Sequence, residues 1–151
     1  MRASRSTSLL AAAVAVLLGA CTSTTELRPA DQPVVAVDGP ALDARMTAVV
    51  VASGVTFELR ITDMQTAPLT AHFNTSQQYD FRVRRLDGST AWTWSADKGF
   101  TTALTSRTFA PGETVVYTAT WTPTERGSFV VDGWLTSSSH AALASAPLSV
   151  P

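Results

Sequence analysis

The fold is decided by the stretch His72-Phe-Asn-Thr-Ser-Gln-Gln-Tyr-Asp-Phe-Arg-Val-Arg-Arg-Leu-Asp-Gly-Ser-Thr-Ala-Trp-Thr-Trp-Ser95. In its middle, apolar and charged side chains alternate from Tyr79 to Arg84, the period-2 pattern of a half-buried strand. Asp87-Gly88 follow, and an Asp-Gly pair supplies the positive φ values of a type I′ turn. Trp92 and Trp94 then lie on one face of the returning run. We therefore predict an antiparallel hairpin with this turn at its tip.

Further β-patterned runs flank this hairpin. They are Arg45–Ser53, Val55–Asp63, Leu69–Thr75, Val115–Trp121, Ser128–Thr136 and Pro147–Val150. Turn signals separate them, among them Ser53-Gly54, Ala67-Pro68 and Phe109-Ala-Pro-Gly-Glu113. We find no amphipathic helix that could cover a parallel sheet. Seven to nine short strands over about 105 residues favour an all-β, immunoglobulin-like two-sheet antiparallel sandwich, and a small barrel is the structural alternative.

Several of these segments, taken in order and at these spacings, resemble a known family. They are Phe73-Asn-Thr-Ser-Gln77, Tyr79-Asp80-Phe81, Asp87-Gly88, Trp92-Thr-Trp-Ser95, Phe100, Phe109-Ala-Pro-Gly-Glu113 and Trp121. Together they resemble the intracellular proteinase inhibitor (BsuPI-type) domain family over Thr56 to Leu135. The resemblance implies a β-sandwich and inhibition of a serine proteinase. The chain departs from the family pattern at Asp63, where an asparagine is usual, and at Gly99, where a bulky residue is usual.

The N-terminal residues have the pattern of an export signal. Arg2 and Arg5 precede the apolar run Leu9–Leu18, which is too short to span a bilayer and ends at Leu18-Gly19-Ala20-Cys21. We interpret residues 1–20 as a signal peptide. The Leu-Gly-Ala-Cys ending resembles the bacterial lipobox, which implies that Cys21 becomes the first mature residue and carries a diacylglyceryl group, with palmitate as a suitable label. Cysteine occurs once in the chain, at this position.

The segment 21–44 is polar, contains Pro29, Pro33 and Pro40, and shows no sustained period, so we interpret it as a lipidated tether. Val34 to Val37 remain a candidate edge strand within it. The sandwich domain is then residues 45–151. The expected location is the cell envelope, with the protein anchored to a membrane through Cys21 and facing the periplasm or the exterior.

The net charge argues against nucleic-acid binding, and the cysteine content excludes an internal disulfide. Removal of residues 1–20 lowers Lys+Arg from 11 to 9 against 12 Asp+Glu, so the mature net charge is 9 − 12 = −3. A mildly acidic domain with scattered basic residues has no electrostatic footprint for nucleic acid. Because Cys21 is the single cysteine, no disulfide can form, and the core alone must hold the domain.

The residues that could carry catalysis are few. The chain has two histidines, His72 in a strand pattern and His140 in a serine-rich loop, and neither belongs to a metal-ligand spacing. No nucleophile elbow or phosphate-binding glycine loop occurs. Ser, His and Asp are all present, but a triad is recognised only by its geometry. We therefore predict a protein that is not an enzyme and has no catalytic residue, metal or cofactor.

We expect the aromatic side chains to form the core rather than a surface on which a ligand stacks. Each can bury about 150–250 Å², and a domain without a disulfide needs that burial. We expect Trp92 and Trp121 in the core, whereas Trp94 and Trp134 are left between core and surface. We expect Asp80, which lies between two aromatic residues, to face water or to hydrogen-bond a neighbouring turn.

Two functions compete. In the first, the domain inhibits an envelope proteinase through the loop from Ser95 to Thr101, whose ends are fixed by Trp94 and Phe100. The candidate contact residues of this loop are Ser95, Asp97, Lys98, Gly99 and Phe100, and a trypsin-like pocket could accept Lys98. The same loop could instead be an ordinary solvated connection. In the second function, the domain is a lipid-anchored binding or assembly module that contacts another envelope protein without inhibiting a proteinase.

Overall fold

Three antiparallel strands build the first layer of the domain. In the computed structural model, which describes residues 40–151, β1 (Leu42–Val51) and β2 (Gly54–Asp63) form the hairpin predicted around Ser53-Gly54. β2 also pairs with β7 (Thr114–Trp121), so the order in this sheet, called sheet A, is β1-β2-β7. The inward side chains of β2 alternate as predicted, and Val55, Phe57, Leu59 and Ile61 are completely buried.

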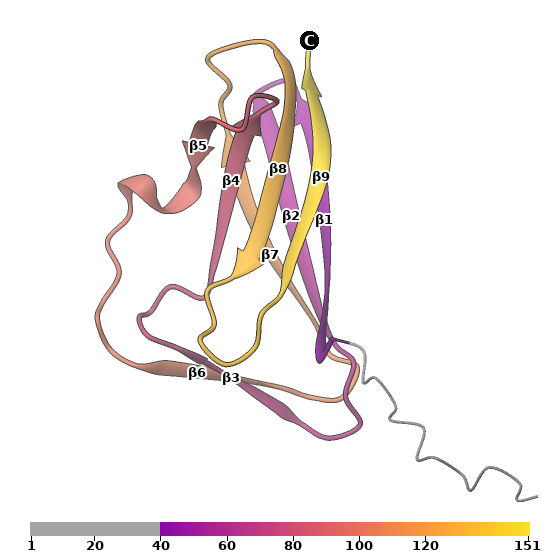
Figure 1. Cartoon of the computed structure of the whole chain (residues 1–151), viewed down its shortest axis with the longest axis vertical. Helices are drawn as coiled ribbons and strands as arrows, with labels where there is room; N and C mark the ends of the chain where they lie inside the picture. The colour runs from indigo at the N-terminus through magenta and orange to yellow at the C-terminus, as the bar shows by residue number, and fades with distance from the viewer. Residues whose placement is uncertain (1–39) are drawn as a thin grey trace, which may run out of the picture. The chain divides into compact units, whose positions relative to one another are not determined.

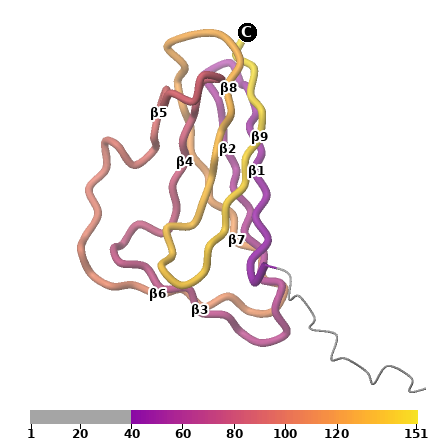
Figure 2. The backbone as a smooth tube through the Cα atoms, viewed as in Figure 1, coloured from indigo at the N-terminus to yellow at the C-terminus, as the bar shows by residue number. Residues whose placement is uncertain are grey.

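Four strands build the opposite layer, called sheet C, in the order β5-β4-β8-β9. Their bounds are β4 Tyr79–Arg85, β5 Thr90–Thr93, β8 Gly127–Leu135 and β9 Leu143–Val150. β9 lies beside β1 of sheet A, so the two layers meet along this side (Figures 1 and 2). A third pair, β3 (Leu69–Phe73) with β6 (Thr105–Phe109), crosses one end of the sandwich (Figure 1).

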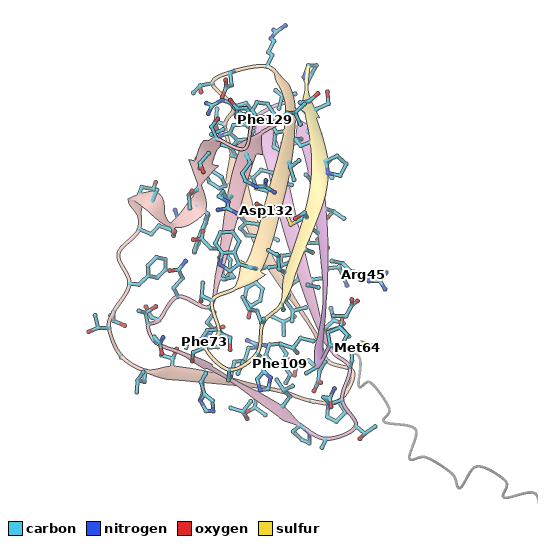
Figure 3. The ribbon with its side chains drawn as sticks, in the orientation of Figure 1. Arg45, Met64, Phe73, Phe109, Phe129 and Asp132 are labelled. Carbon is cyan, nitrogen blue, oxygen red and sulfur yellow. The ribbon has the colours of Figure 1, made fainter. Side chains whose placement is uncertain are left out.

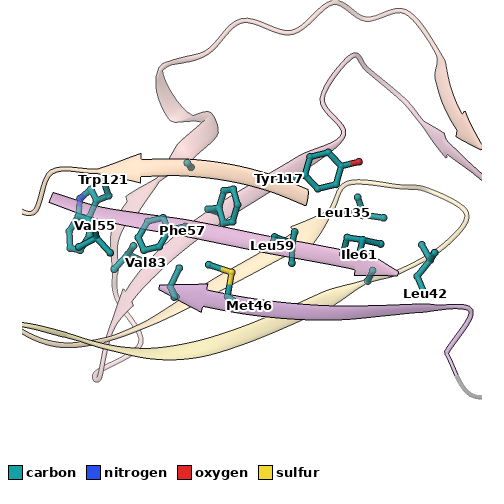
Figure 4. Packing of buried hydrophobic residues seen from close by; sticks show 14 of the residues in the cluster. Leu42, Met46, Val55, Phe57, Leu59, Ile61, Val83, Tyr117, Trp121 and Leu135 are labelled. Carbon is teal, nitrogen blue, oxygen red and sulfur yellow. The ribbon is translucent and has the colours of Figure 1, made fainter. Parts of the chain in front are cut away.

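The fold is therefore all-β and antiparallel, and the two layers form an immunoglobulin-like sandwich as predicted. Its core fills the space between sheets A and C, and Figure 4 shows Met46, Phe57, Leu59 and Val83 pointing into that space. Phe73 and Phe109, on β3 and β6, are also buried and close one end of the core (Figure 3). No helix among residues 40–151 is long and apolar enough to cross a membrane.

Two predicted boundaries change. β1 begins at Leu42, so residues 42–44 belong to the sandwich and not to the tether, because the Leu42 side chain is buried in the core. β9 begins at Leu143, four residues before the predicted closing strand. β6 was not predicted as a strand. The predicted edge strand Val34 to Val37, the predicted signal peptide and the predicted lipidation site Cys21 lie outside the described residues.

The central hairpin is confirmed, but two of its details were wrong. The turn bond runs from the Gly88 N–H to the Arg85 carbonyl, 3.0 Å away, so Leu86 and Asp87 are the central residues and the turn is not type I′ with Asp-Gly at its centre. β5 ends at Thr93. Trp94 therefore does not share a strand face with Trp92 but begins a short 3₁₀ helix, η1 (Trp94–Asp97).

The predicted turn between β6 and β7 has the expected chemistry. The Glu113 N–H donates to the Ala110 carbonyl at 2.8 Å, with Pro111 second and Gly112 third in the turn. Gly112 has φ of 73°, the conformation that a type II turn requires at this place. The Glu113 carboxylate accepts a bond from the Ala110 N–H, and this bond is the main reason that the pKa of Glu113 is lowered.

An ion cluster ties three strands of sheet C together on its outer face. The Asp132 side chain on β8 is 4 % exposed (Figure 3). It accepts hydrogen bonds from Arg84 at 2.6 and 2.9 Å, from Arg82 at 3.1 and 3.3 Å and from the Ser145 hydroxyl at 2.7 Å. The hydrogen bonds from Arg84 contribute most to lowering the pKa of Asp132 from 3.8 to about 2. The charged form is thus the one that stabilises the fold.

This cluster predicts a specific acid sensitivity. Because the folded pKa lies below the unfolded one, the contribution of Asp132 is present above about pH 4 and is lost as the pH falls toward 2. We expect Asp132→Asn to lower the free energy of unfolding by about 2 kcal/mol at pH 7, and the gap to the parent to close between pH 4 and 2. Urea midpoints measured across this range test it, and a gap that stays constant with pH would contradict it.

Candidate functional site

The predicted contact loop begins inside η1 and continues as an extended connection to β6. Ser95 and Asp97 lie in η1, whereas Lys98, Gly99 and Phe100 follow it. The first bend is closed by the Lys98 N–H, which donates to the Ser95 carbonyl at 3.1 Å. In Figure 1 this segment stands out from the sandwich on the β5 side. Its tip is exposed, and no atom lies within 4 Å of a Cβ placed on Gly99.

A buried carboxylate fixes the start of the loop. Asp80 on β4 is only 5 % exposed, and its Oδ2 accepts the Ser95 hydroxyl at 2.5 Å. Its Oδ1 accepts the Ser95 N–H at 3.2 Å and the Phe81 N–H at 2.8 Å. Of the two positions expected for Asp80, the hydrogen bond to a neighbouring turn is the one that occurs, and the side chain does not face water. Because Ser95 bonds Asp80 through both its backbone and its side chain, it is a support of the loop rather than a free contact residue.

A second anchor fixes the far end of the loop. Thr101 donates its N–H to the Ser76 hydroxyl and accepts the Ser76 N–H at its carbonyl, both at 3.0 Å. Beyond it, the Thr105 hydroxyl donates to the Thr75 carbonyl at 2.9 Å. Nothing in the sequence spacing indicated this pair, since Ser76 precedes Thr101 by 25 residues. Between its two anchors the loop is short, which limits the conformations open to it.

Stacked aromatic rings connect the loop to the core. Tyr117 on β7 packs in a tilted arrangement against Tyr79 of β4, with ring centres 4.5 Å apart, and Tyr79 stacks on Trp94 at 4.4 Å. Trp94 in turn contacts Phe100 at 5.9 Å. The half-buried Trp94 is thus a support of the loop. Burial raises the pKa values of both tyrosines, so their hydroxyls stay neutral at physiological pH.

The Lys98 side chain is folded back onto this support. Its ammonium lies 4.9 Å from the centre of the Trp94 ring and 2.9 Å from the Asp97 carboxylate. The Lys98 side chain is 35 % exposed, whereas that of Asp97 is 83 % exposed. The hydrogen bond from Lys98 is the main cause of the lowered pKa of Asp97. The loop therefore presents an acidic group beside a partly covered cation.

The remaining aromatic and titratable residues take structural positions. Trp121 is buried as predicted, whereas Trp92 is only half-buried, against the core beside Phe57. Trp134 is half-buried on the outer face of sheet C, where the Arg82 guanidinium lies 5.7 Å from its ring. Among residues 40–151, no group of three or more His, Cys, Asp or Glu side chains could hold a metal ion.

A shallow hollow of about 400 Å³ lies away from the loop, at the β1–β2 turn. Its walls come from residues 50–54, from the β7–β8 connection at 122–126 and from Val150 and Pro151. None of the predicted contact residues lines it.

Comparison with known families decides the class of the domain. Residues 42–140 match the model of the BsuPI family, described as intracellular proteinase inhibitor. This match covers more than half of the chain. The chain belongs to the BsuPI family of proteinase inhibitors. As a BsuPI domain it carries Asp63 at the buried end of β2 and Gly99 at the exposed tip of the loop.

Other comparisons add little. No curated protein matches the chain. The similar solved structures include the β-glucuronidase 2 of Bacteroides uniformis covalently bound to cyclophellitol-6-carboxylate aziridine and a β-glucuronidase of the same organism. Their sequence identities are 12 % and 11 %, with TM-scores of 0.45 and 0.43. Each match covers 74 % of this chain and 14 % of the other, and at this level it carries no argument about function.

The anchoring of the loop can be tested at Ser95. Ser95→Ala removes the 2.5 Å bond and leaves Asp80 Oδ2 buried without that donor, which should cost about 1–3 kcal/mol. We also expect faster hydrogen exchange of the backbone amides of residues 95–101. The control is Ser106→Ala on β6, an exposed serine, which should change neither quantity. Equal exchange rates in parent and Ser95→Ala would show that Asp80 does not order the loop.

Proposed function

We propose that this chain is a proteinase inhibitor anchored at the cell envelope, and that it binds a serine proteinase non-covalently through the segment from Ser95 to Thr101. Membership of the BsuPI family supports the class of activity and favours a protein-binding role over a catalytic one. The observation that carries the choice of segment is its anchoring at both ends, by Asp80 to Ser95 and by Ser76 to Thr101.

Double anchoring is what an inhibitory loop requires. A flexible loop that enters a proteinase cleft is cut and released, whereas a loop that is already ordered loses little entropy on binding and resists the distortion that cleavage needs. The chain has no disulfide to supply this order. Hydrogen bonds to a buried carboxylate and a stack of aromatic rings supply it here, so inhibition should weaken as temperature loosens the sandwich.

Lys98 can reach a specificity pocket at modest cost. Its contact with the Trp94 ring is worth about 0.5–1 kcal/mol, and its ion pair with the exposed Asp97 is screened by water. An acidic pocket of a trypsin-like proteinase would replace both interactions. The exposed Asp97 beside it would then favour proteinases with basic residues near the pocket.

A second function is supported by the same side chain. Lys98 is folded back rather than extended into solvent, and Gly99 next to it leaves the tip less restricted than a bulky residue would. Both features suit a binding or assembly module of the envelope that carries the family fold without inhibiting a proteinase.

Titration against a panel of serine proteinases separates the two functions. We expect the full-length protein, purified in detergent, to remove the activity of a trypsin-like enzyme stoichiometrically. Lys98→Ala should weaken that inhibition several-fold or more while the urea midpoint stays within about 0.5 kcal/mol of the parent, as for other surface substitutions.

The matched control is Arg45→Ala, which removes an exposed cation from β1 in the other sheet and should leave inhibition unchanged. Full inhibition by Lys98→Ala would remove this side chain as the contact. If the parent protein is digested or ignored by every enzyme of the panel, the binding-module function takes its place.

Anchoring at the envelope is tested at Cys21. Cys21→Ser removes the single sulfur that a lipid could modify, so the variant should shift from the membrane fraction to unprocessed precursor or soluble protein and lose incorporation of labelled palmitate. Unchanged palmitate incorporation would reject the lipobox interpretation.

A further inference from the structure

β7 is an edge strand without the protection that the other edges of sheets A and C have. The second edge strand of sheet A, β1, lies beside β9, which is itself an edge strand of sheet C (Figures 1 and 2). The remaining edge strand of sheet C, β5, has four residues and an irregular register against β4. β7 has eight residues, and no strand among residues 40–151 pairs with its outer edge.

The alternation of hydrogen bonds along β2 shows which backbone N–H and C=O groups of β7 point away from β2. The Asp63 N–H donates to the Glu113 carbonyl at 2.9 Å, and the Met64 N–H donates to Ala41 on the opposite side at 3.0 Å. Odd-numbered residues of β2 therefore bond β7, and even-numbered ones bond β1. In the register of β2 with β7, the residues that turn their N–H and C=O groups away from β2 are Thr114, Val116, Thr118 and Thr120. In the described part of the chain, no hydrogen bond uses these backbone groups.

The side chains of β7 favour strand pairing. The strand Thr114–Trp121 has the sequence Thr-Val-Val-Tyr-Thr-Ala-Thr-Trp, which contains no charged residue, proline or glycine. The outward-facing threonines are exposed, and Val116 is 42 % exposed. Natural edge strands that avoid association usually carry a lysine, a proline or a bulge, and β7 has none of these.

We propose that this edge pairs with the same edge of a second copy of the chain, antiparallel and about a two-fold axis. An antiparallel pair of identical strands is self-complementary, so each outward N–H meets an outward C=O of the other copy. The register that uses all four outward residues places Thr114 opposite Thr120 and Val116 opposite Thr118. Because β7 carries no charged residue, two copies of this strand can pair without placing like charges opposite each other, which favours a second copy as the partner.

Cross-strand threonine pairs of this kind already occur within the chain. The hydroxyls of Thr62 and Thr114 lie 2.9 Å apart across β2 and β7, and those of Thr70 and Thr108 lie 2.9 Å apart across β3 and β6. Such pairs contribute to sheet stability. The proposed register adds Thr114 opposite Thr120 twice, once on each side of the axis.

The mass of the full-length protein in detergent tests the pairing, measured by light scattering after gel filtration over a range of concentrations. We expect a dimer, and we expect Val116→Lys to raise its dissociation constant about tenfold or more, because a lysine on the edge opposes strand addition. Thr56→Lys is the matched control, since it adds the same charge to the same face of sheet A but on the central strand β2. Association through the N-terminal residues would be common to all three proteins.

Cross-linking tests the register. In one chain, residues 114 and 120 are about 20 Å apart along the strand, too far for a disulfide, but they face each other across the proposed axis. The double variant with Thr114→Cys and Thr120→Cys should therefore form interchain disulfides under mild oxidation. Each single variant, which retains Cys21 as the double variant does, should form few.

Two outcomes would overturn the proposal. One is a monomeric parent whose mass at every concentration equals that of Val116→Lys. The other is a dimer in which Val116→Lys and Thr56→Lys dissociate alike and the double cysteine variant cross-links no more than the single ones. A cooperative urea transition establishes that each variant is folded.

Discussion

The packing of the Phe57 ring between the two sheets is the interaction on which the rest of this domain depends. It is completely buried in the middle strand of sheet A, and its ring lies 5.9 Å from Phe81 of sheet C, 5.8 Å from Trp92 and 6.5 Å from Trp121. A single aromatic side chain thus joins both layers at their centre. Because no disulfide can form, burial of this cluster is the main term that opposes the conformational entropy of the chain.

The same packing reaches the surface on one side. The rings of Tyr117 and Tyr79 carry contacts from between the sheets to Trp94 and the base of the loop. Asp80 lies at the same base of the loop. Its buried carboxylate accepts hydrogen bonds from the Ser95 hydroxyl and the Phe81 N–H, as a buried polar group requires. The base of the loop is therefore held by buried and half-buried residues of the sandwich. A mutation that loosens Tyr79 or Asp80 would alter the loop without touching its exposed tip.

The alternation of apolar and polar side chains predicted the strands. The features that it did not predict depend on contacts between residues far apart in the sequence. The alternation in β2, β4 and β7 is a property of neighbouring residues, so the sandwich could be predicted from sequence. The Thr-Trp alternation predicts Trp94 on the strand with Trp92, but β5 ends at Thr93, where the next residue but one, Ser95, bonds Asp80, 15 residues away in the sequence. No sequence motif or spacing indicated that Ser76 would pair with Thr101. The sequence predicted Lys98 as a contact residue, but it did not indicate that the Lys98 ammonium lies over the Trp94 ring.

Asp63 shows how a family position can change and keep its structural task. The side chain is buried at the end of β2, where Oδ1 accepts the Gln65 N–H at 2.9 Å and the backbone bonds Glu113 and Gly112. An asparagine, usual in the resembling family, would provide the same Oδ1 acceptor. The carboxylate differs at Oδ2, which is buried without a hydrogen-bond partner. A buried unsatisfied polar atom costs about 1–3 kcal/mol, and the backbone hydrogen bonds that Asp63 makes with Glu113 and Gly112 offset that cost.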